Sequence, residues 1–183
     1  MGKPADWVRI VMNRETERWV ADLGPEKLDA FEVSGHKWGR FPFKSYANRM
    51  YPDLDICEQA PDGSYDVIVA EQVWEHLKHP YRATQNVLSA LRPGGYFIVT
   101  VPFLIRRHPT PLDCSRWTAE GLKYFLEECG FENVRSDDWG NRACLEANLD
   151  KWVRYEEGTH SLENEENFPL VAWAMGQKPS SAM

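Results

Sequence analysis

Three residues between positions 108 and 116 have side chains whose chemistry suits proton transfer and substrate contact. Histidine titrates at about pH 6.5, so His108 can accept a proton during a reaction. A carboxylate such as Asp113 can orient an imidazole ring, and Arg116 offers a planar fork of donors to hydroxyl or anionic groups. We therefore predict His108 as a catalytic base, Asp113 as its orienting partner and Arg116 as a substrate contact. The alternative is that Asp113 and Arg116 pair with each other and cap the next helix.

A second histidine, His76, follows the acidic residue Glu75. His76 is the second candidate base; the alternative is a ring that hydrogen-bonds a backbone carbonyl and orients its loop. His76 and His79 have the i, i+3 spacing of a metal-binding pair, but no third ligand is evident close by. We therefore predict no metal site, and a divalent ion acting together with substrate hydroxyls is the exception to test.

Apolar runs and turn signals predict the elements that must position these side chains. The predicted strands cover residues 28–33, 65–70, 96–101, 131–135 and 168–175, and the predicted helices cover 6–23, 80–92, 118–130 and 145–153. Residues 36–53 are aromatic and are expected to be irregular. Strands that alternate with helices predict a mostly parallel sheet covered on both faces.

Ligands of parallel sheets bind beyond the carboxyl ends of the strands. The residues that follow the predicted strands are Ser34 and Gly35, Glu71 and Gln72, and the segment 102–116. We expect these three places to border one cleft.

Residues 62–102 combine several short motifs in a fixed order. Glu75-His76-Leu77 follows the strand at 65–70, and Pro93-Gly94-Gly95 leads into the strand at 96–101. This stretch resembles the class I S-adenosylmethionine (SAM) methyltransferases of the group often called type 11, and it matches their fourth strand, the turn after it and the fifth strand. The later pattern His-x-x-Pro-x-Asp-x-x-Arg-x-Thr, residues 108–118, resembles a subgroup with many members in saccharide-building pathways.

The resemblance implies an α/β fold and a reaction. The fold would be one doubly wound domain over residues 1–183, with a mostly parallel sheet of seven strands whose last strand, near 168–175, is antiparallel. We expect an N-terminal helix within 1–24, an exposed acidic loop at 156–167 and a flexible tail at 177–183. The reaction would be transfer of the methyl group of SAM to an acceptor.

The loop after the first strand departs from the family pattern. That loop is normally Gly-x-Gly-x-Gly, whereas this chain keeps the acidic Glu32 and, of the glycines, only Gly35 and Gly39. The resemblance implies that Glu32 helps to fix the SAM ammonium group and that Ser34 and Gly35 give backbone access. An ordinary strand-to-loop turn is the alternative. The loss of glycines also implies weakened SAM affinity.

The nucleoside of SAM needs further partners. Asp53 and Asp55 lie about 20 residues beyond the loop, at the spacing of a ribose-binding carboxylate. Asp55 with Ile56 also resembles the family's third-strand acid, which accepts from the adenine amino group, and we prefer this role. The ribose then needs a partner such as Tyr46, and Asp53 is better explained as a solvated loop acid.

The remaining expectations concern the acceptor. Glu71 and Gln72 are expected to line the cofactor cleft, and Trp38 and Trp117 to stack on a sugar or on adenine, because flat rings suit ring-shaped ligands. We expect O-methylation of a saccharide hydroxyl, with His108 as the base. The alternatives are a small-molecule N- or carboxyl-methyltransferase, which needs no strong base, and a non-catalytic partner subunit.

Composition excludes several other classes of protein. The chain has 21 Lys and Arg against 28 Asp and Glu, a formal net charge of −7, which argues against a nucleic-acid partner. No apolar run is long enough to span a membrane and residues 1–4 lack a signal-peptide core, so we expect a cytoplasmic protein. The four cysteines form no CxxC pair and are expected to be reduced. A divalent metal is not favoured, and a homodimer is left open.

Overall fold

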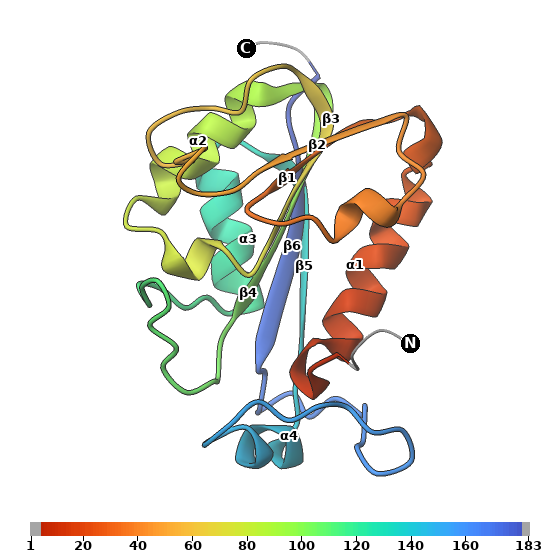
Figure 1. The fold of residues 1–183 in the computed structure, drawn as a ribbon, viewed down its shortest axis with the longest axis vertical. Helices are drawn as coiled ribbons and strands as arrows, with labels where there is room; N and C mark the ends of the chain where they lie inside the picture. Colours follow the sequence, from red (N-terminus) through yellow and green to blue (C-terminus); the bar gives the residue numbers. More distant parts are fainter. Residues whose placement is uncertain (1–4, 181–183) are drawn as a thin grey trace.

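Six strands form one sheet in the computed structural model, which describes residues 5–180 (Figure 1). Their order across the sheet is β2-β1-β3-β4-β6-β5. In chain order the strands are β1 (Asp29–Val33), β2 (Ser45–Arg49), β3 (Tyr65–Glu71), β4 (Leu91–Pro102), β5 (Glu132–Trp139) and β6 (Val171–Gln177). The α-helices are α1 (Ile10–Asp22), α2 (Pro80–Ala90), α3 (Ala119–Glu128) and α4 (Arg142–Ala147).

The central strand β3 shows why the sheet is covered on both faces. Its residues 67–70 (Val-Ile-Val-Ala) are all buried, and a continuous apolar run of this kind must be packed from above and below. Helices α2 and α3 cover one face and α1 the other, as Figure 1 shows. The sheet therefore separates two hydrophobic clusters and leaves its carboxyl edge to loops.

The strand directions confirm part of the expected topology. Strands β2, β1, β3 and β4 are parallel, and β6 runs antiparallel to both β4 and β5, as predicted for the last strand. The described residues hold six strands, not the seven predicted. The family resemblance placed that family's third strand at Asp55-Ile56. This segment is instead a turn, because the Asp55 carboxylate and carbonyl both accept backbone N–H groups from residues 57–59.

Strand β2 lies in the segment that was expected to be irregular. Residues 45–49 read Ser-Tyr-Ala-Asn-Arg and pair with β1 at the edge of the sheet. An edge strand exposed at both ends has no continuous apolar run, so its sequence gives no strand signal.

Helix α4 also differs from its prediction at 145–153. The Asn141 side chain accepts the Cys144 backbone N–H at 2.7 Å and begins the helix earlier. The Asn148 side chain ends it by donating to the Cys144 carbonyl and accepting the Val153 backbone N–H. Leu149, which fitted the apolar spacing, is exposed.

The chain turns sharply where β1 and β3 end. Ser34 and Gln72 directly follow these neighbouring parallel strands, and both have φ of 56°, a left-handed backbone that is uncommon outside glycine. The Ser34 backbone N–H donates to Arg49, and that of Gln72 donates to Thr100. Residues in such backbone conformations cluster at functional sites.

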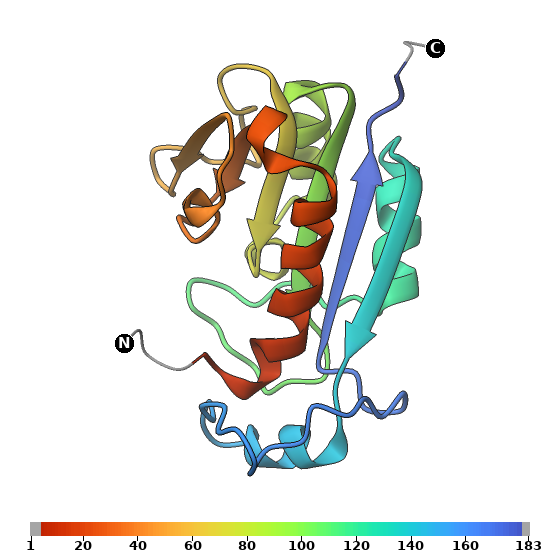
Figure 2. The same cartoon turned by 90° about the vertical axis from the view of Figure 1, so that its right-hand side faces the viewer.

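Distant segments meet at this end of the sheet. Figure 2 shows the loop after β4 and the loops after α4 at the same end, near the start of α1. Arg106 bonds the Asn148 carbonyl at 2.6 Å and lies over the Trp152 ring at 4.1 Å. In the part of the chain that the structure describes, no helix combines the length and apolarity needed to cross a membrane.

Candidate active site

The Glu32 carboxylate holds the loop that follows β1. It is buried and accepts the backbone N–H groups of Lys37 (3.2 Å) and Trp38 (2.8 Å) and the Tyr46 hydroxyl (2.7 Å). A Cβ built at Gly35 would lie 1.9 Å from Glu32 Oε1, so a side chain there would displace the Glu32 carboxylate from its hydrogen bonds. The structure thus gives Glu32 and Gly35 a shared role in shaping the loop, and the expected contact of Glu32 with the SAM ammonium group stays a prediction.

Tyr46 belongs to the same group of contacts. Burial, followed by its hydrogen bond to Glu32, raises the pKa of the Tyr46 phenol well above its ordinary value. Tyr46 therefore remains a neutral donor that bonds Glu32, and its ring lies against Gly39, where an added Cβ would approach within 2.8 Å. Its expected contact with the ribose stays a prediction.

The larger pocket lies beyond the carboxyl ends of β1, β2 and β3. It has a volume of about 740 Å³. Three predicted cofactor residues, Ser34, Asp55 and Gln72, line it. Its other lining residues are Met50, Tyr51, Cys57, Glu58, Val73, His76, Leu77, Lys78, His79, Pro111 and Leu112. The adjacent Ile56 is buried in the core.

Glu71, also predicted to line the cofactor cleft, instead forms ion pairs with two basic side chains. Its carboxylate pairs with Lys37 Nζ at 2.7 Å and with Arg9 at 3.6 Å. Lys37 Nζ also donates to Asn13 Oδ1 at 2.7 Å. Glu71 thereby ties β3 to the loop after β1 and to the N-terminal helix, and it is not among the described residues that line the two pockets.

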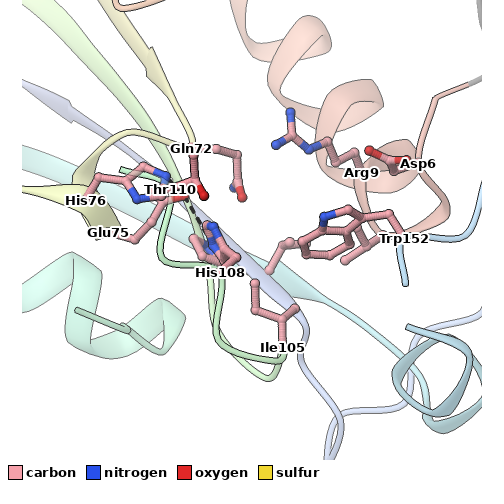
Figure 3. Close-up of a pocket in the computed structure, with 12 residues that line it drawn as sticks. Asp6, Arg9, Gln72, Glu75, His76, Ile105, His108, Thr110 and Trp152 are labelled. Atoms are coloured by element: carbon pink, nitrogen blue, oxygen red, sulfur yellow. Dashed lines mark ion pairs between the residues drawn. The ribbon is translucent and has the colours of Figure 1, made fainter. Parts of the chain in front are cut away.

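A smaller pocket of about 220 Å³ adjoins the larger one and shares Gln72 and His76 with it (Figure 3). Arg9 and Trp152 stand on one side and Glu75, His76 and His108 on the other. Asp6, Val8, Pro102, Ile105, Thr110 and Val171 complete the lining. Both candidate bases of the sequence therefore border one small cavity.

Glu75 is the most unusual group of this pocket. Its side chain is 0% exposed, and neither carboxylate oxygen accepts a hydrogen bond from another described residue. Oε1 lies 3.6 Å from His76 Nε2 and 4.0 Å from His108 Nε2. Burial raises the pKa of Glu75 to about 7. Burial, and then the neighbouring His76, lower the pKa of His108.

The two rings are held in different ways. His76 Nδ1 contacts the Leu112 carbonyl, which is the alternative that the sequence left open for this residue. The His108 backbone N–H donates to Asp113 Oδ2 at 2.9 Å. Asp113 therefore positions the backbone of His108, whereas the expected contact was with the ring.

Asp113 and Arg116 form an ion pair through both carboxylate oxygens, with Nη2 and Oδ2 2.7 Å apart. The hydrogen bonds from Arg116 lower the pKa of Asp113 to about 2. This is the mutual pairing considered as the alternative, and it engages the guanidinium group that was expected to contact substrate. Neither Arg116 nor Asp113 is among the described residues that line the smaller pocket.

The two tryptophans predicted to stack on ligands lie elsewhere. Trp38 is 1% exposed and packs on Phe41, with ring centroids 5.3 Å apart. Trp117 is half-buried against Phe125. Both rings contribute to the hydrophobic clusters, and neither is among the described lining residues of the two pockets.

Glu75, Arg9 and Trp152 are among the residues of the smaller pocket that sequence reasoning missed. Glu75 had a local signal, because it precedes His76 and follows an apolar strand. Arg9 and Trp152 had none, since they come from opposite ends of the chain. They meet because the Trp7 backbone N–H donates to the Val153 carbonyl at 2.8 Å and brings the two segments together.

Comparison with known proteins identifies the class. Residues 13–136 match the family described as methyltransferase domain. The chain therefore belongs to this family, within the class I SAM-dependent methyltransferases.

Two curated proteins are similar to part of the chain. It is 35% identical over 100 residues to a probable SAM-dependent methyltransferase of Mycolicibacterium smegmatis, covering 48% of this chain and 39% of that protein. It is 28% identical over 129 residues to a tRNA U34 carboxymethyltransferase of Hahella chejuensis, covering 61% of this chain and 40% of that one. The chain thus spans well under half the length of these curated relatives.

The fold also matches a solved structure. Phosphoethanolamine N-methyltransferase 2 of Haemonchus contortus, in complex with S-adenosylhomocysteine, aligns with 97% of this chain and 54% of its own, with a TM-score of 0.61. Sequence identity over that alignment is 10%, so this likeness shows the fold alone.

Proposed function

We propose that this chain transfers the methyl group of SAM to an acceptor hydroxyl, with the cofactor in the larger pocket and the acceptor in the smaller one. The observation that carries the proposal is the wall common to both pockets, Gln72 and His76. A ligand in each pocket would place donor and acceptor on either side of this wall, and close positioning is the main contribution that such a reaction needs.

The larger pocket fits the cofactor in size and in donor set. Its volume of about 740 Å³ falls within the usual range for small-molecule sites. Asp55 Oδ1 accepts the Cys57 backbone N–H at 2.9 Å, so Oδ2 is the oxygen that would accept from the nucleoside. Ser34 and Gln72 line the pocket with a left-handed backbone conformation, which glycine adopts more commonly than other residues.

The chemistry divides between cofactor and chain. SAM, when bound, supplies a methyl group on a positively charged sulfur. The chain orients Gln72 between the pockets, because its amide Nε2 donates to Thr100 Oγ1 at 3.3 Å and contacts Met12 Sδ at 3.5 Å. We assign to Glu75, His76 and His108 together the task of stabilising an acceptor oxygen that loses its proton.

The acceptor class that we propose is a saccharide hydroxyl. Three features support it: the basic and acidic groups of the smaller pocket, the half-exposed ring of Trp152, and the likeness of residues 108–118 to the subgroup from saccharide-building pathways. An aromatic face such as that of Trp152 can pack on the apolar face of a sugar. A hydroxyl must lose its proton in this reaction, and positioned acid–base groups such as those of the Glu75 cluster serve that need.

The test begins with cofactor binding, measured by calorimetry with S-adenosylhomocysteine. Asp55→Asn is expected to weaken binding, because it turns an acceptor oxygen into a donor. Asp53→Asn is the matched control, since Asp53 does not line the larger pocket. No binding at high micromolar ligand, or an equal effect of both substitutions, would overturn the cofactor assignment.

Transfer is then measured from labelled SAM to a panel of free sugars, sugar nucleotides, amines and carboxylates. Label is expected in alkali-stable ethers of a hydroxyl acceptor. Transfer only to nitrogen or to carboxylates, undiminished in His108→Ala, would refute the hydroxyl acceptor while leaving the methyltransferase assignment in place.

A further inference from the structure

A buried carboxylate without partners is costly, and the protein interior normally supplies a cation or donors to compensate it. Glu75 is 0% exposed, and no other described residue donates a hydrogen bond to either of its oxygens. The nearby guanidinium groups are engaged elsewhere: Arg9 pairs with Glu71, and Arg116 pairs with Asp113. Apart from His76 and His108, which carry a charge only when protonated, no described cation pairs with Glu75.

The two histidines face the same carboxylate oxygen. His76 Nε2 and His108 Nε2 lie 3.6 Å and 4.0 Å from Glu75 Oε1. One ligand atom from each of the three residues can be chosen so that all lie within 4.8 Å of one another. Ligand bonds of about 2.0–2.2 Å in a tetrahedral site put ligand atoms about 3.3–3.6 Å apart, so a small contraction would enclose an ion.

Each of the two imidazole rings also has an Nε2 atom available to bind a metal ion. The contact between His76 Nδ1 and the Leu112 carbonyl assigns the proton to Nδ1 and leaves the Nε2 lone pair toward Glu75. Metal-binding histidines usually have this kind of partner on their second nitrogen. His108 Nε2 is enclosed and has no hydrogen-bond partner among the described residues, so it too is available.

We propose that Glu75, His76 and His108 bind one divalent transition-metal ion at the wall of the smaller pocket (Figure 3). Two imidazoles and one carboxylate suit ions such as Zn²⁺, Mn²⁺, Co²⁺ and Fe²⁺ better than Ca²⁺ or Mg²⁺. Three protein ligands leave at least one coordination position open to the pocket, as in catalytic rather than structural sites.

The open position gives the ion a role that rests on the proposed function. An acceptor hydroxyl bound there would become more acidic, because the cation stabilises its alkoxide form. The hydroxyl proton would pass to water, the oxygen would bond the methyl carbon, and the bond between that carbon and the cofactor sulfur would break. An acceptor with two neighbouring hydroxyls could fill two positions on the ion, which makes a vicinal diol the preferred substrate class.

Metal binding can be tested without cofactor or substrate. Protein stripped with a chelator is titrated with Co²⁺, followed by calorimetry and by visible absorption of the ion. We expect one equivalent to bind with the absorption of a four- or five-coordinate site. Glu75→Gln and His108→Ala should each weaken binding at least about tenfold, since even loss of an outer partner of a ligand commonly has that effect. His36→Ala, which changes an exposed histidine outside the cluster and outside the described lining of both pockets, should leave it unchanged.

A second measurement needs no variant and so does not depend on the folding of Glu75→Gln. In the wild-type protein, Co²⁺ should shift or broaden the ring proton resonances of His76 and His108 at one equivalent, and leave those of His36 and His160 sharp. Failure to bind, binding that survives Glu75→Gln, or broadening centred on His36 or His160 would overturn the site.

The outcome is distinguishable from failure of the proposed function. S-adenosylhomocysteine affinity is measured on the metal-free and Co²⁺-loaded protein. Cofactor binding without metal binding refutes the metal site alone, and metal binding without cofactor binding refutes the methyl transfer alone. If both bind, removal of the metal should abolish transfer to a diol, and transfer that continues undiminished would overturn the catalytic part of the inference.

Discussion

At the scale of single residues, the Glu32 carboxylate lies where a side chain at position 35 would begin. The φ of Gly35 lies outside the left-handed region, so the obstacle to a side chain there is steric, from the Glu32 carboxylate. That carboxylate in turn holds two backbone N–H groups of the loop. The loop after β1 lacks most of the family's glycines but keeps Glu32 and Gly35, and this one contact explains why both residues are present.

Gly35→Ala is expected to destabilise the protein by about 1–3 kcal/mol, the usual cost of forcing an added methyl group into a packed site. The cost should shrink in a Glu32→Ala background, because the clashing oxygen is then absent. Urea unfolding of the four proteins of this cycle measures the coupling. An equal cost in both backgrounds would show that the loop is not built around this contact.

Tyr46→Phe isolates the third hydrogen bond of Glu32. The substitution removes a donor 2.7 Å from a buried carboxylate and should cost about 1–3 kcal/mol of unfolding free energy. Tyr51→Phe is the control, since Tyr51 is 72% exposed. Comparable midpoints in urea for the two variants would contradict the role given to Tyr46.

At the scale of elements, Asp29 joins three strands of the sheet. Its carboxylate, at the start of β1, accepts from Ser45 of β2 and pairs with Arg92 of β4 and with Lys44. These contacts, the Ser45 hydrogen bond first, lower the pKa of Asp29 from 3.8 to about 2. A carboxylate whose pKa is depressed in the folded state stabilises the fold above its unfolded pKa and loses that effect as the pH falls.

Asp29→Asn should therefore lower the thermal unfolding midpoint at pH 7, and the difference from wild type should shrink as the pH falls from about 4 towards 2. Differential scanning calorimetry at pH 7, 5, 4 and 3 follows it. Asp22→Asn, at the end of α1 and away from this junction, is the control. A difference that is constant over this range would mean that the ion pairs contribute nothing.

The limits of prediction from sequence are clearest for the elements. Val67 to Ala70 form a continuous apolar run, so β3 and its neighbours follow from hydrophobic pattern. Strand β2 is polar because it lies at the edge, and only its pairing with β1 defines it. The ends of α4 depend on the Asn141 and Asn148 side chains, whose hydrogen bonds outweigh the apolar spacing at 145–153.

At the scale of the whole molecule, the site is assembled from both ends of the chain. Residues after β3 and β4 were found from the sequence because the carboxyl ends of parallel strands share an edge. Arg9 and Trp152 reach the same pocket only through contacts between the N-terminal segment and the loop after α4. No local pattern encodes such a meeting, so this side of the smaller pocket had no sequence signal.

Because Trp152 lines the smaller pocket and not the larger one, acceptor and cofactor binding should respond separately to its loss. Trp152→Ala removes an aromatic wall that carries the Arg106 guanidinium, and it should lower kcat/KM for the acceptor about tenfold, the effect of losing roughly 1.4 kcal/mol. Its affinity for S-adenosylhomocysteine should stay within about twofold of wild type. Leu149→Ala, in the same loop but outside the described lining of both pockets, is the control and should change neither quantity. A loss of cofactor affinity that matches the loss of turnover would mean that the two pockets act as one, and the division of donor and acceptor across Gln72 and His76 would then be wrong.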